Sequence, residues 1–220
     1  PAAQGATTGI ALRPGAARSG IRVRTIRGDA GEAFVIAFAG PGAPPGEIRL
    51  PTWLGDGSVL RALPVARREV LLASFQGNRG TGVAQKLLAV IGVDDAGALR
   101  ILGIETLSFR DAQVGAASRR MAGGIEAVPR RDALLLRQDT TLRRRGRETR
   151  EAWTTRLAWT GAGILDAAPS PPGAGEVRRR VDAARARIAA ILSAAPVTDA
   201  TRIDHDGTGI WAVGYAEPLT

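Results

Sequence analysis

The chain contains no cysteine and only one histidine, His205. The missing thiols exclude disulfide bonds, thiolate nucleophiles, iron–sulfur clusters and cysteine-bound zinc. A Ser–His–Asp triad would depend on His205, and no serine lies in a G-x-S-x-G motif. General-base chemistry would therefore fall to carboxylates. The sequence favours a protein that is not an enzyme and needs no cofactor.

Long apolar runs and aromatic residues are also scarce. The longest apolar runs, VLLA (70–73) and KLLAVIGV (86–93), are too short to span a membrane. Aromatic residues make up 4% of the chain, whereas proteins that bind single-stranded nucleic acid place aromatic platforms between their basic residues. We therefore predict no transmembrane segment, and nucleic acid is not the expected partner.

The absence of cysteine also bears on the compartment. It suits an oxidising environment, where an unpaired thiol would be a liability. The sequence begins at Pro1 without a methionine, which is compatible with the removal of a signal peptide. We expect a periplasmic or secreted protein.

The formal net charge is +9, and Lys86 is the only lysine, so arginine supplies almost all of the positive charge. Such residues can simply form a soluble, ion-paired surface. They also favour acidic partners, because arginine makes bidentate contacts and is enriched at interfaces. One cluster lies at a predicted hairpin tip and consists of Arg143, Arg144, Arg145, Arg147 and Arg150. A second cluster lines a predicted helix and consists of Arg178, Arg179, Arg180, Arg185 and Arg187.

The pattern of glycine, proline and apolar residues indicates many short strands joined by turns. Residues 1–20 are small, polar and glycine-rich, and they predict a flexible N-terminal arm. Alternation begins in IRVRTI (21–26), which predicts a half-buried strand with an arginine face. We expect residues 21–220 to form a single β-rich domain.

Three antiparallel hairpins are predicted next. Residues 83–93 and 98–107 flank the turn DDAG, and residues 121–128 and 132–142 flank PRRD. The third hairpin turns at Gly146. In its second strand, one face holds Trp153, Thr155, Leu157 and Trp159.

Residues 176–192 predict the one long helix, because apolar residues recur at helical spacing while arginines fill the other face. Its apolar stripe consists of Val177, Val181, Ala184, Ile188 and Ile191. The expected fold is mostly β (α+β). It is an antiparallel β-sandwich or an open curved barrel of hairpins, with this C-terminal amphipathic helix packed on the sheet. A last strand is predicted at 209–215.

The stretch SFQGNRGTGVAQK (74–86) holds Gly77 and Gly82 at the spacing of a Walker loop. A Walker loop needs lysine and a hydroxyl residue directly after its second glycine. Here valine and alanine follow, and Lys86 lies four residues past Gly82. We predict a β-hairpin loop that offers two side chains to solvent, a partner or an anion, Asn78 and Arg79.

Two further groups of residues are candidate chemical sites. IDHDGTG (203–209) contains Asp204, His205 and Asp206 but lacks the later ligands of a calcium loop, so we predict a surface turn and no metal. A glycosidase-like pair would need two carboxylates about 5–10 Å apart in a cleft. The candidates on or near strands are Glu105, Glu126, Asp139 and Glu151.

Three functions are left open by these observations. The favoured one is a non-catalytic extracytoplasmic binding or accessory protein that docks an acidic partner, expected to be another protein. The alternatives are a carrier of a small or lipidic ligand, held in a cavity between the curved sheet and the helix, and a carboxylate-dependent hydrolase. The residues predicted to contact a partner or an anion are Arg143, Arg144, Arg145, Arg147, Arg150, Asn78 and Arg79.

Overall fold

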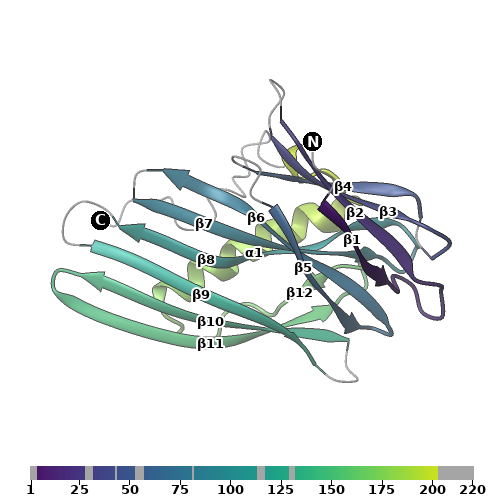
Figure 1. Cartoon of the computed structure of the whole chain (residues 1–220). Coiled ribbons are helices and arrows are strands. Elements are labelled where there is room, and N and C mark those ends of the chain that lie inside the picture. The colour runs from purple at the N-terminus through teal and green to yellow at the C-terminus, as the bar shows by residue number, and fades with distance from the viewer. Residues whose placement is uncertain are drawn as a thin grey trace.

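Two antiparallel sheets and one long helix make up the computed structural model (Figure 1), which describes residues 4–27, 32–42, 44–52, 57–80, 82–112, 117–128 and 132–202. Sheet A has the strand order β1-β2-β3-β4, with β1 (Gln4–Ile10), β2 (Ser19–Ile26), β3 (Ala33–Ala39) and β4 (Gly46–Pro51). Sheet B runs in reverse chain order from β12 to β5, with β5 (Gly57–Val65), β6 (Arg68–Gly80), β7 (Val83–Val93), β8 (Leu99–Ala112), β9 (Ala117–Ala127), β10 (Ala133–Arg144), β11 (Arg147–Trp159) and β12 (Leu165–Asp166). Helix α1 (Glu176–Ala194) and the short 3₁₀ helix η1 (Ala200–Arg202) follow.

This architecture confirms the predicted mostly β fold with one C-terminal helix, and neither sheet of the described chain closes into a barrel. The three predicted hairpins are β7–β8, β9–β10 and β10–β11. In β11, Trp153, Thr155 and Leu157 are buried while Arg156 is exposed, as the alternation predicted. No helix in the described ranges is long and apolar enough to cross a membrane. The strand predicted at 209–215 lies outside the described residues.

Within residues 1–20, for which the composition predicted a flexible arm, Gln4–Ile10 forms strand β1 of sheet A. Strand β1 pairs antiparallel with β2. Ile10 and Leu12 are fully buried in a core that also holds residues of β3 and α1. Burying an aliphatic side chain stabilises a fold by about 1.5–3 kcal/mol, so these two residues hold the segment in place despite its small neighbours.

Three buried clusters fill the fold. The first joins sheet A to β6, β7, β8 and the second half of α1, and it contains Phe34, Ile36, Phe75, Ile91 and Ile188. The second lies within the curve of sheet B and contains Leu72, Leu88, Leu102, Leu136 and Leu157. The third packs the first half of α1 on the sheet and consists of Phe109, Met121, Trp153, Val177 and Val181.

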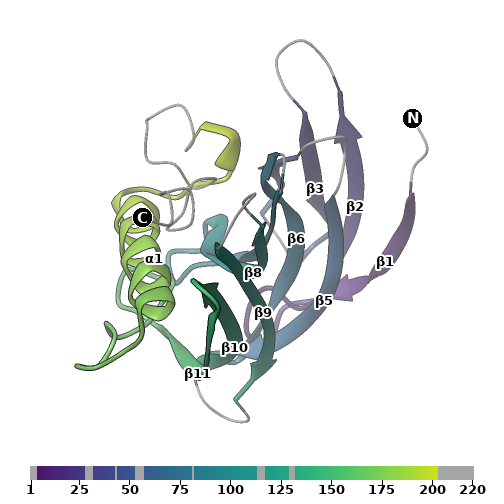
Figure 2. The same cartoon turned by 90° about the vertical axis from the view of Figure 1, so that its left-hand side faces the viewer.

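Sheet B divides where β9 leaves β8. The two strands pair only over the segment that ends at Ser108 opposite Ala122, whereas β9 stays paired with β10 as far as Ala127. At the dividing point, the side chain of Gln138 donates a hydrogen bond to the carbonyl oxygen of Thr106 at 3.4 Å. Arg61 of β5 donates to the carbonyl of Ile125 on β9. Sheet B therefore curls around the second cluster, but its edge strands β5 and β12 do not pair, so the sheet stays open (Figure 2).

Polar contacts dock α1 at both ends. The Gly175 N–H donates to Glu151 Oε1 at 3.1 Å just before the first turn. At the last turn, the buried guanidinium of Arg100 donates to the carbonyl oxygens of Leu192 and Ala195. An acidic group at the N-terminus and a basic group at the C-terminus both complement the helix dipole. Two strands of sheet B therefore fix the position of the helix along its axis.

The centre of α1 is held by a buried ion pair. Arg185 donates to both carboxylate oxygens of Glu105 on β8, at 2.6 and 3.0 Å, and also pairs with Asp182. Only 5% of the Arg185 side chain is exposed. The prediction that all helix arginines line an outer face is therefore wrong for Arg185. Burial raises the pKa of Glu105, and the positive charge of Arg185 offsets part of that effect.

A polar cluster around Asp95, separate from the three buried apolar clusters, links three parts of sheet B near β12. Trp159 Nε1 of β11 donates to Asp95 Oδ2 at 2.9 Å, in the turn between β7 and β8. Arg68 of β6 pairs with Asp95 Oδ1 at 2.7 Å and lies over the Trp159 ring, 4.5 Å from its centroid. The hydrogen bond from Trp159 lowers the pKa of Asp95, burial offsets part of this effect, and Arg68 lowers the pKa further.

This cluster gives a pH-dependent contribution to stability. We expect Asp95→Asn to lower the free energy of unfolding by about 0.5–1 kcal/mol at pH 7, because the carboxylate is largely solvent-exposed. The folded pKa lies below the unfolded value of about 3.9, so the stabilisation is complete above the unfolded value and is lost as pH falls through the folded value. Urea unfolding between pH 7 and pH 2.5 measures this difference. Asp139→Asn is the control, because Asp139 has no hydrogen bond or ion pair with another described residue and should change nothing.

Candidate functional site

One face of sheet B collects basic side chains from five neighbouring strands, and we call it the basic face. Residues directly opposite each other in an antiparallel pair point to the same side of a sheet. The register places Lys86 opposite Ser108, Arg110 opposite Arg120, and Thr141 opposite both Arg120 and Arg150. Among the described side chains, the basic residues of this face are Lys86, Arg110, Arg120, Arg137, Arg143, Arg150 and Arg156, and the acidic ones are Glu126, Asp139 and Glu148.

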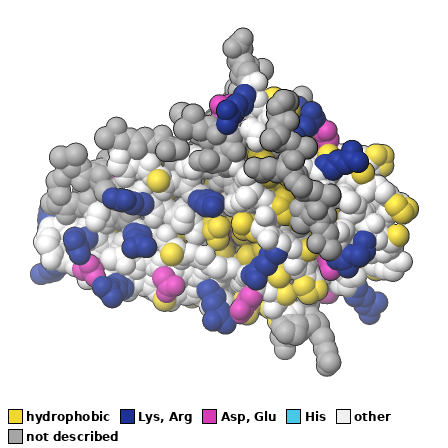
Figure 3. All heavy atoms as spheres, in the orientation of Figure 1, with side chains coloured by type: hydrophobic (Ala, Val, Ile, Leu, Met, Phe, Trp, Pro, Cys, Tyr) yellow, Lys and Arg dark blue, Asp and Glu magenta, His cyan; other side chains and the backbone are white. Residues whose placement is uncertain are grey.

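The space-filling view confirms that positive charge dominates this side. Figure 3 is drawn from the side of Figure 1 and shows lysine and arginine side chains spread over the half of the molecule built by β8 to β11. Arg137 pairs with Glu126 at 2.8 Å, with both side chains exposed. The three acidic side chains of this face cannot neutralise its seven basic ones. The basic face therefore keeps a net positive charge and favours anionic partners.

The tip of the β10–β11 hairpin carries the arginine cluster that the sequence predicted. Arg145 and Gly146 form its two-residue turn, with φ of 48° and 74°. Glu148 accepts hydrogen bonds from Arg143 at 2.8 Å and from Arg150 at 2.9 Å, and these bonds lower its pKa. All five arginines of the cluster are exposed, and three of them have no hydrogen bond or ion pair with another described residue: Arg144, Arg145 and Arg147.

The glycine-rich stretch connects two strands, as predicted. Strand β6 ends at Gly80, β7 begins at Val83, and Gly82 has the positive φ of 80° that favours glycine. No helix follows, so the phosphate-binding arrangement of a Walker loop is absent from these strands. The prediction that Asn78 and Arg79 lie in the loop is wrong, because both belong to β6. Their side chains are outside the described part of the structure.

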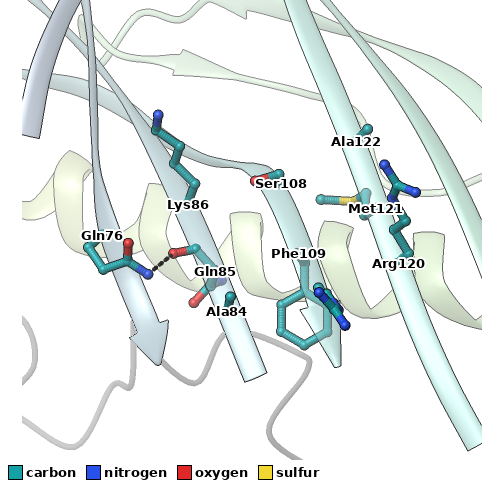
Figure 4. A pocket seen from close by; sticks show the side chains of 10 residues that line it. Gln76, Ala84, Gln85, Lys86, Ser108, Phe109, Arg120, Met121 and Ala122 are labelled. Atoms are coloured by element: carbon teal, nitrogen blue, oxygen red, sulfur yellow. Dashed lines mark hydrogen bonds between the residues drawn. The ribbon is translucent and has the colours of Figure 1, made fainter. Parts of the chain in front are cut away.

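A hollow of about 270 Å³ opens on the basic face beside Lys86 (Figure 4). Ser108 lies between Lys86 on β7 and Arg120 on β9, and the amide of Gln76 donates to the carbonyl oxygen of Gln85 at 2.8 Å. Arg110 of β8 also lines the hollow. Among its described lining residues there is no aspartate or glutamate.

A second hollow of about 410 Å³ adjoins the first, since Gln76 and Lys86 line both. Its other lining residues are Gly57, Ser58 and Ser74, and the two serine hydroxyls are hydrogen-bonded to each other at 2.9 Å. Together the hollows form a groove that is cationic at one end and neutral and polar at the other. Volumes of this order are typical of small-molecule sites. We call it the Lys86 groove.

The four candidate carboxylates are not brought together. Glu105 is paired with Arg185, and Glu151 accepts the hydrogen bond from Gly175 at the start of α1. Glu126 and Asp139 share the basic face, but Glu126 lies opposite Leu135, which is roughly 13 Å along the strand from Asp139. This arrangement gives the hydrolase alternative no support.

The space between sheet and helix is small in the described structure. The hollow lined by Leu87, Glu105, Val181 and Arg185 has a volume of about 10 Å³, which is room for one water molecule. It gives no support to a ligand held between sheet and helix. No group of three or more possible metal ligands occurs among the described residues, and the predicted turn at Asp204, His205 and Asp206 lies outside them.

Comparison of the chain with known protein families, with curated proteins and with solved structures finds no match.

Proposed function

We propose that this chain is a non-catalytic binding or accessory protein that docks the acidic surface of another protein through the tip of the β10–β11 hairpin and the adjoining basic face. The observation that carries the proposal is the exposed charge at the tip, where Arg144 lies directly opposite Arg147. Like charges directly opposite each other destabilise a sheet. An acidic partner would supply the negative charge that neither arginine finds among the described residues.

The geometry of the tip suits a docking role. Figure 1 places it at the end of sheet B that lies far from sheet A. Exposed ion pairs within one chain contribute little to stability, whereas complementary charge across an interface raises association rates and fixes orientation. We also propose that this protein works outside the cytoplasm, because the absence of cysteine suits an oxidising compartment.

The proposal predicts a charge-specific affinity for acidic polypeptide. Labelled poly-L-glutamate should bind the wild-type chain at low salt and be released at high salt, as measured by fluorescence anisotropy. Arg144→Gln/Arg147→Gln should weaken this binding about five- to tenfold, because both changes remove exposed charges at the tip.

The control variant removes the same net charge elsewhere. Arg22→Gln/Arg187→Gln changes exposed arginines of β2 and α1 that have no hydrogen bond or ion pair with other described residues. It should retain the affinity of the wild type. The proposal is wrong if the control loses as much affinity as the tip variant. It is also wrong if a single-stranded oligonucleotide binds more tightly than polyglutamate, because the partner would then be nucleic acid.

A further inference from the structure

The Lys86 groove holds three basic side chains, and none of its described lining residues carries a negative charge. Lys86, Arg110 and Arg120 are exposed, and none forms a hydrogen bond or ion pair with another described residue. On the same face of the sheet, the nearest described carboxylate by register is that of Asp139 on β10, which lies opposite Ala122 and does not line the groove. The groove therefore concentrates positive charge at one end.

The register makes this arrangement unfavourable in the free protein. Arg110 and Arg120 lie directly opposite each other on β8 and β9, at the distance where like charges destabilise a sheet. Ser108 stands beside them, opposite Lys86. An oxyanion between the two guanidinium groups would turn this repulsion into charge-assisted hydrogen bonds, and arginine forks match the geometry of phosphate and sulfate.

The other end of the groove selects a polar molecule. Ser58 presents an exposed hydroxyl group, which is hydrogen-bonded to the buried hydroxyl of Ser74, and Gln76 presents an amide. Ser58 can exchange its hydrogen bond with Ser74, and Gln76 its bond to the Gln85 carbonyl oxygen, for bonds to ligand hydroxyl groups. No large apolar side chain is among the described residues that line this part, so it does not suit an acyl chain.

We propose that the Lys86 groove binds a small, soluble organophosphate or organosulfate, with Arg110, Arg120 and Lys86 around the oxyanion and Ser58 and Gln76 along a hydroxyl-rich body. The site is non-catalytic, because no general base lines it among the described residues. It shares the basic face with the proposed docking surface, but none of its described lining residues belongs to the β10–β11 hairpin.

Isothermal titration with glucose 6-phosphate tests this site, with glucose, inorganic phosphate and sulfate as comparison ligands at constant ionic strength. The wild type should bind glucose 6-phosphate saturably, inorganic phosphate and sulfate more weakly, and glucose not at all. Arg110→Gln and Arg120→Gln should each weaken glucose 6-phosphate binding about tenfold. Arg187→Gln, which removes one exposed charge from α1, should leave the affinity unchanged.

Stability gives a second readout that a purely structural role would not produce. Without ligand, Arg120→Gln should raise the midpoint of thermal unfolding by about 1–3 °C, because it removes the repulsion with Arg110. Glucose 6-phosphate should raise the midpoint of the wild type and leave that of Arg120→Gln almost unchanged. Lys86→Gln supplies an independent variant on β7 with the same expected loss of binding.

Several outcomes would overturn the proposal. They are the absence of saturable glucose 6-phosphate binding in the wild type, and binding of glucose as tight as that of glucose 6-phosphate. The others are a loss of affinity in Arg187→Gln as large as in Arg110→Gln, and binding of the protein only to vesicles that contain phosphatidylglycerol. The Arg144→Gln/Arg147→Gln variant should bind glucose 6-phosphate normally while it loses polyglutamate. The two proposals can therefore fail separately.

Discussion

Replacing Arg185 by methionine is expected to lower the free energy of unfolding by about 3–5 kcal/mol at pH 7, because it leaves a buried carboxylate without its partner. Glu105 is 5% exposed and makes both of its described side-chain contacts with the guanidinium group of Arg185. Urea unfolding followed by tryptophan fluorescence measures the loss. Arg187→Met changes an exposed arginine of the same helix and should cost less than about 0.5 kcal/mol.

The loss should depend on pH in a defined direction. Burial already raises the pKa of Glu105, and without the Arg185 charge that pKa rises further. A folded pKa above the unfolded value of about 4.3 means that the folded variant takes up a proton as pH falls. The destabilisation of Arg185→Met should therefore be largest at neutral pH and shrink as the pH falls towards 4.3.

A double variant separates charge from packing. Glu105→Leu/Arg185→Met replaces the ion pair by apolar side chains and should recover most of the stability that Arg185→Met loses. If the double variant is as unstable as Arg185→Met at pH 7, the unpaired carboxylate is not the cause. Equal losses in Arg185→Met and Arg187→Met would show that the buried pair contributes nothing.

The burial of Arg185 shows a limit of helical periodicity. The spacing of apolar residues correctly located the buried stripe, with Val177, Val181, Ala184 and Ile188 all buried. Arg185 borders this stripe, and its side chain is buried only because Glu105 lies beneath it on β8. The two residues are 80 positions apart, and no local pattern pairs an arginine with a distant carboxylate.

The two candidate sites also differ in how far local sequence patterns can predict them. The hairpin tip could be predicted, because a two-residue turn with glycine and the alternation of β11 are local signals. The Lys86 groove could not, because it depends on the register of five strands, and a shift by one residue moves a side chain to the other face. Arg110 and Arg120 stand opposite each other only if β8 and β9 pair in one particular register.

The N-terminal strand was missed for a related reason. The segment from Gln4 to Ile10 is rich in small residues, so its alternation is weak. Its strand conformation comes from pairing with β2 and from the burial of Ile10, and both depend on the assembled sheet. Composition measures local preference, and here the tertiary contacts override it.

The other large loss of stability is expected for Phe75→Ala, at about 3–5 kcal/mol by urea unfolding. Phe75 is fully buried in the first cluster, which joins sheet A to sheet B. It lies opposite Gly57 on β5 and Leu87 on β7. Gly57 has no side chain to fill a cavity, and its backbone is already covered by Phe34, since a Cβ there would lie 2.2 Å from Phe34 Cγ.

The site can therefore collapse little after the ring is removed, which places the expected cost of Phe75→Ala near the top of its range. Phe75→Leu keeps much of the volume and should lose clearly less than the alanine variant. Leu60→Ala, at an apolar side chain that is 44% exposed, should cost less than about 0.5 kcal/mol. If Phe75→Ala costs no more than Leu60→Ala, packing around Phe75 does not hold the two sheets together.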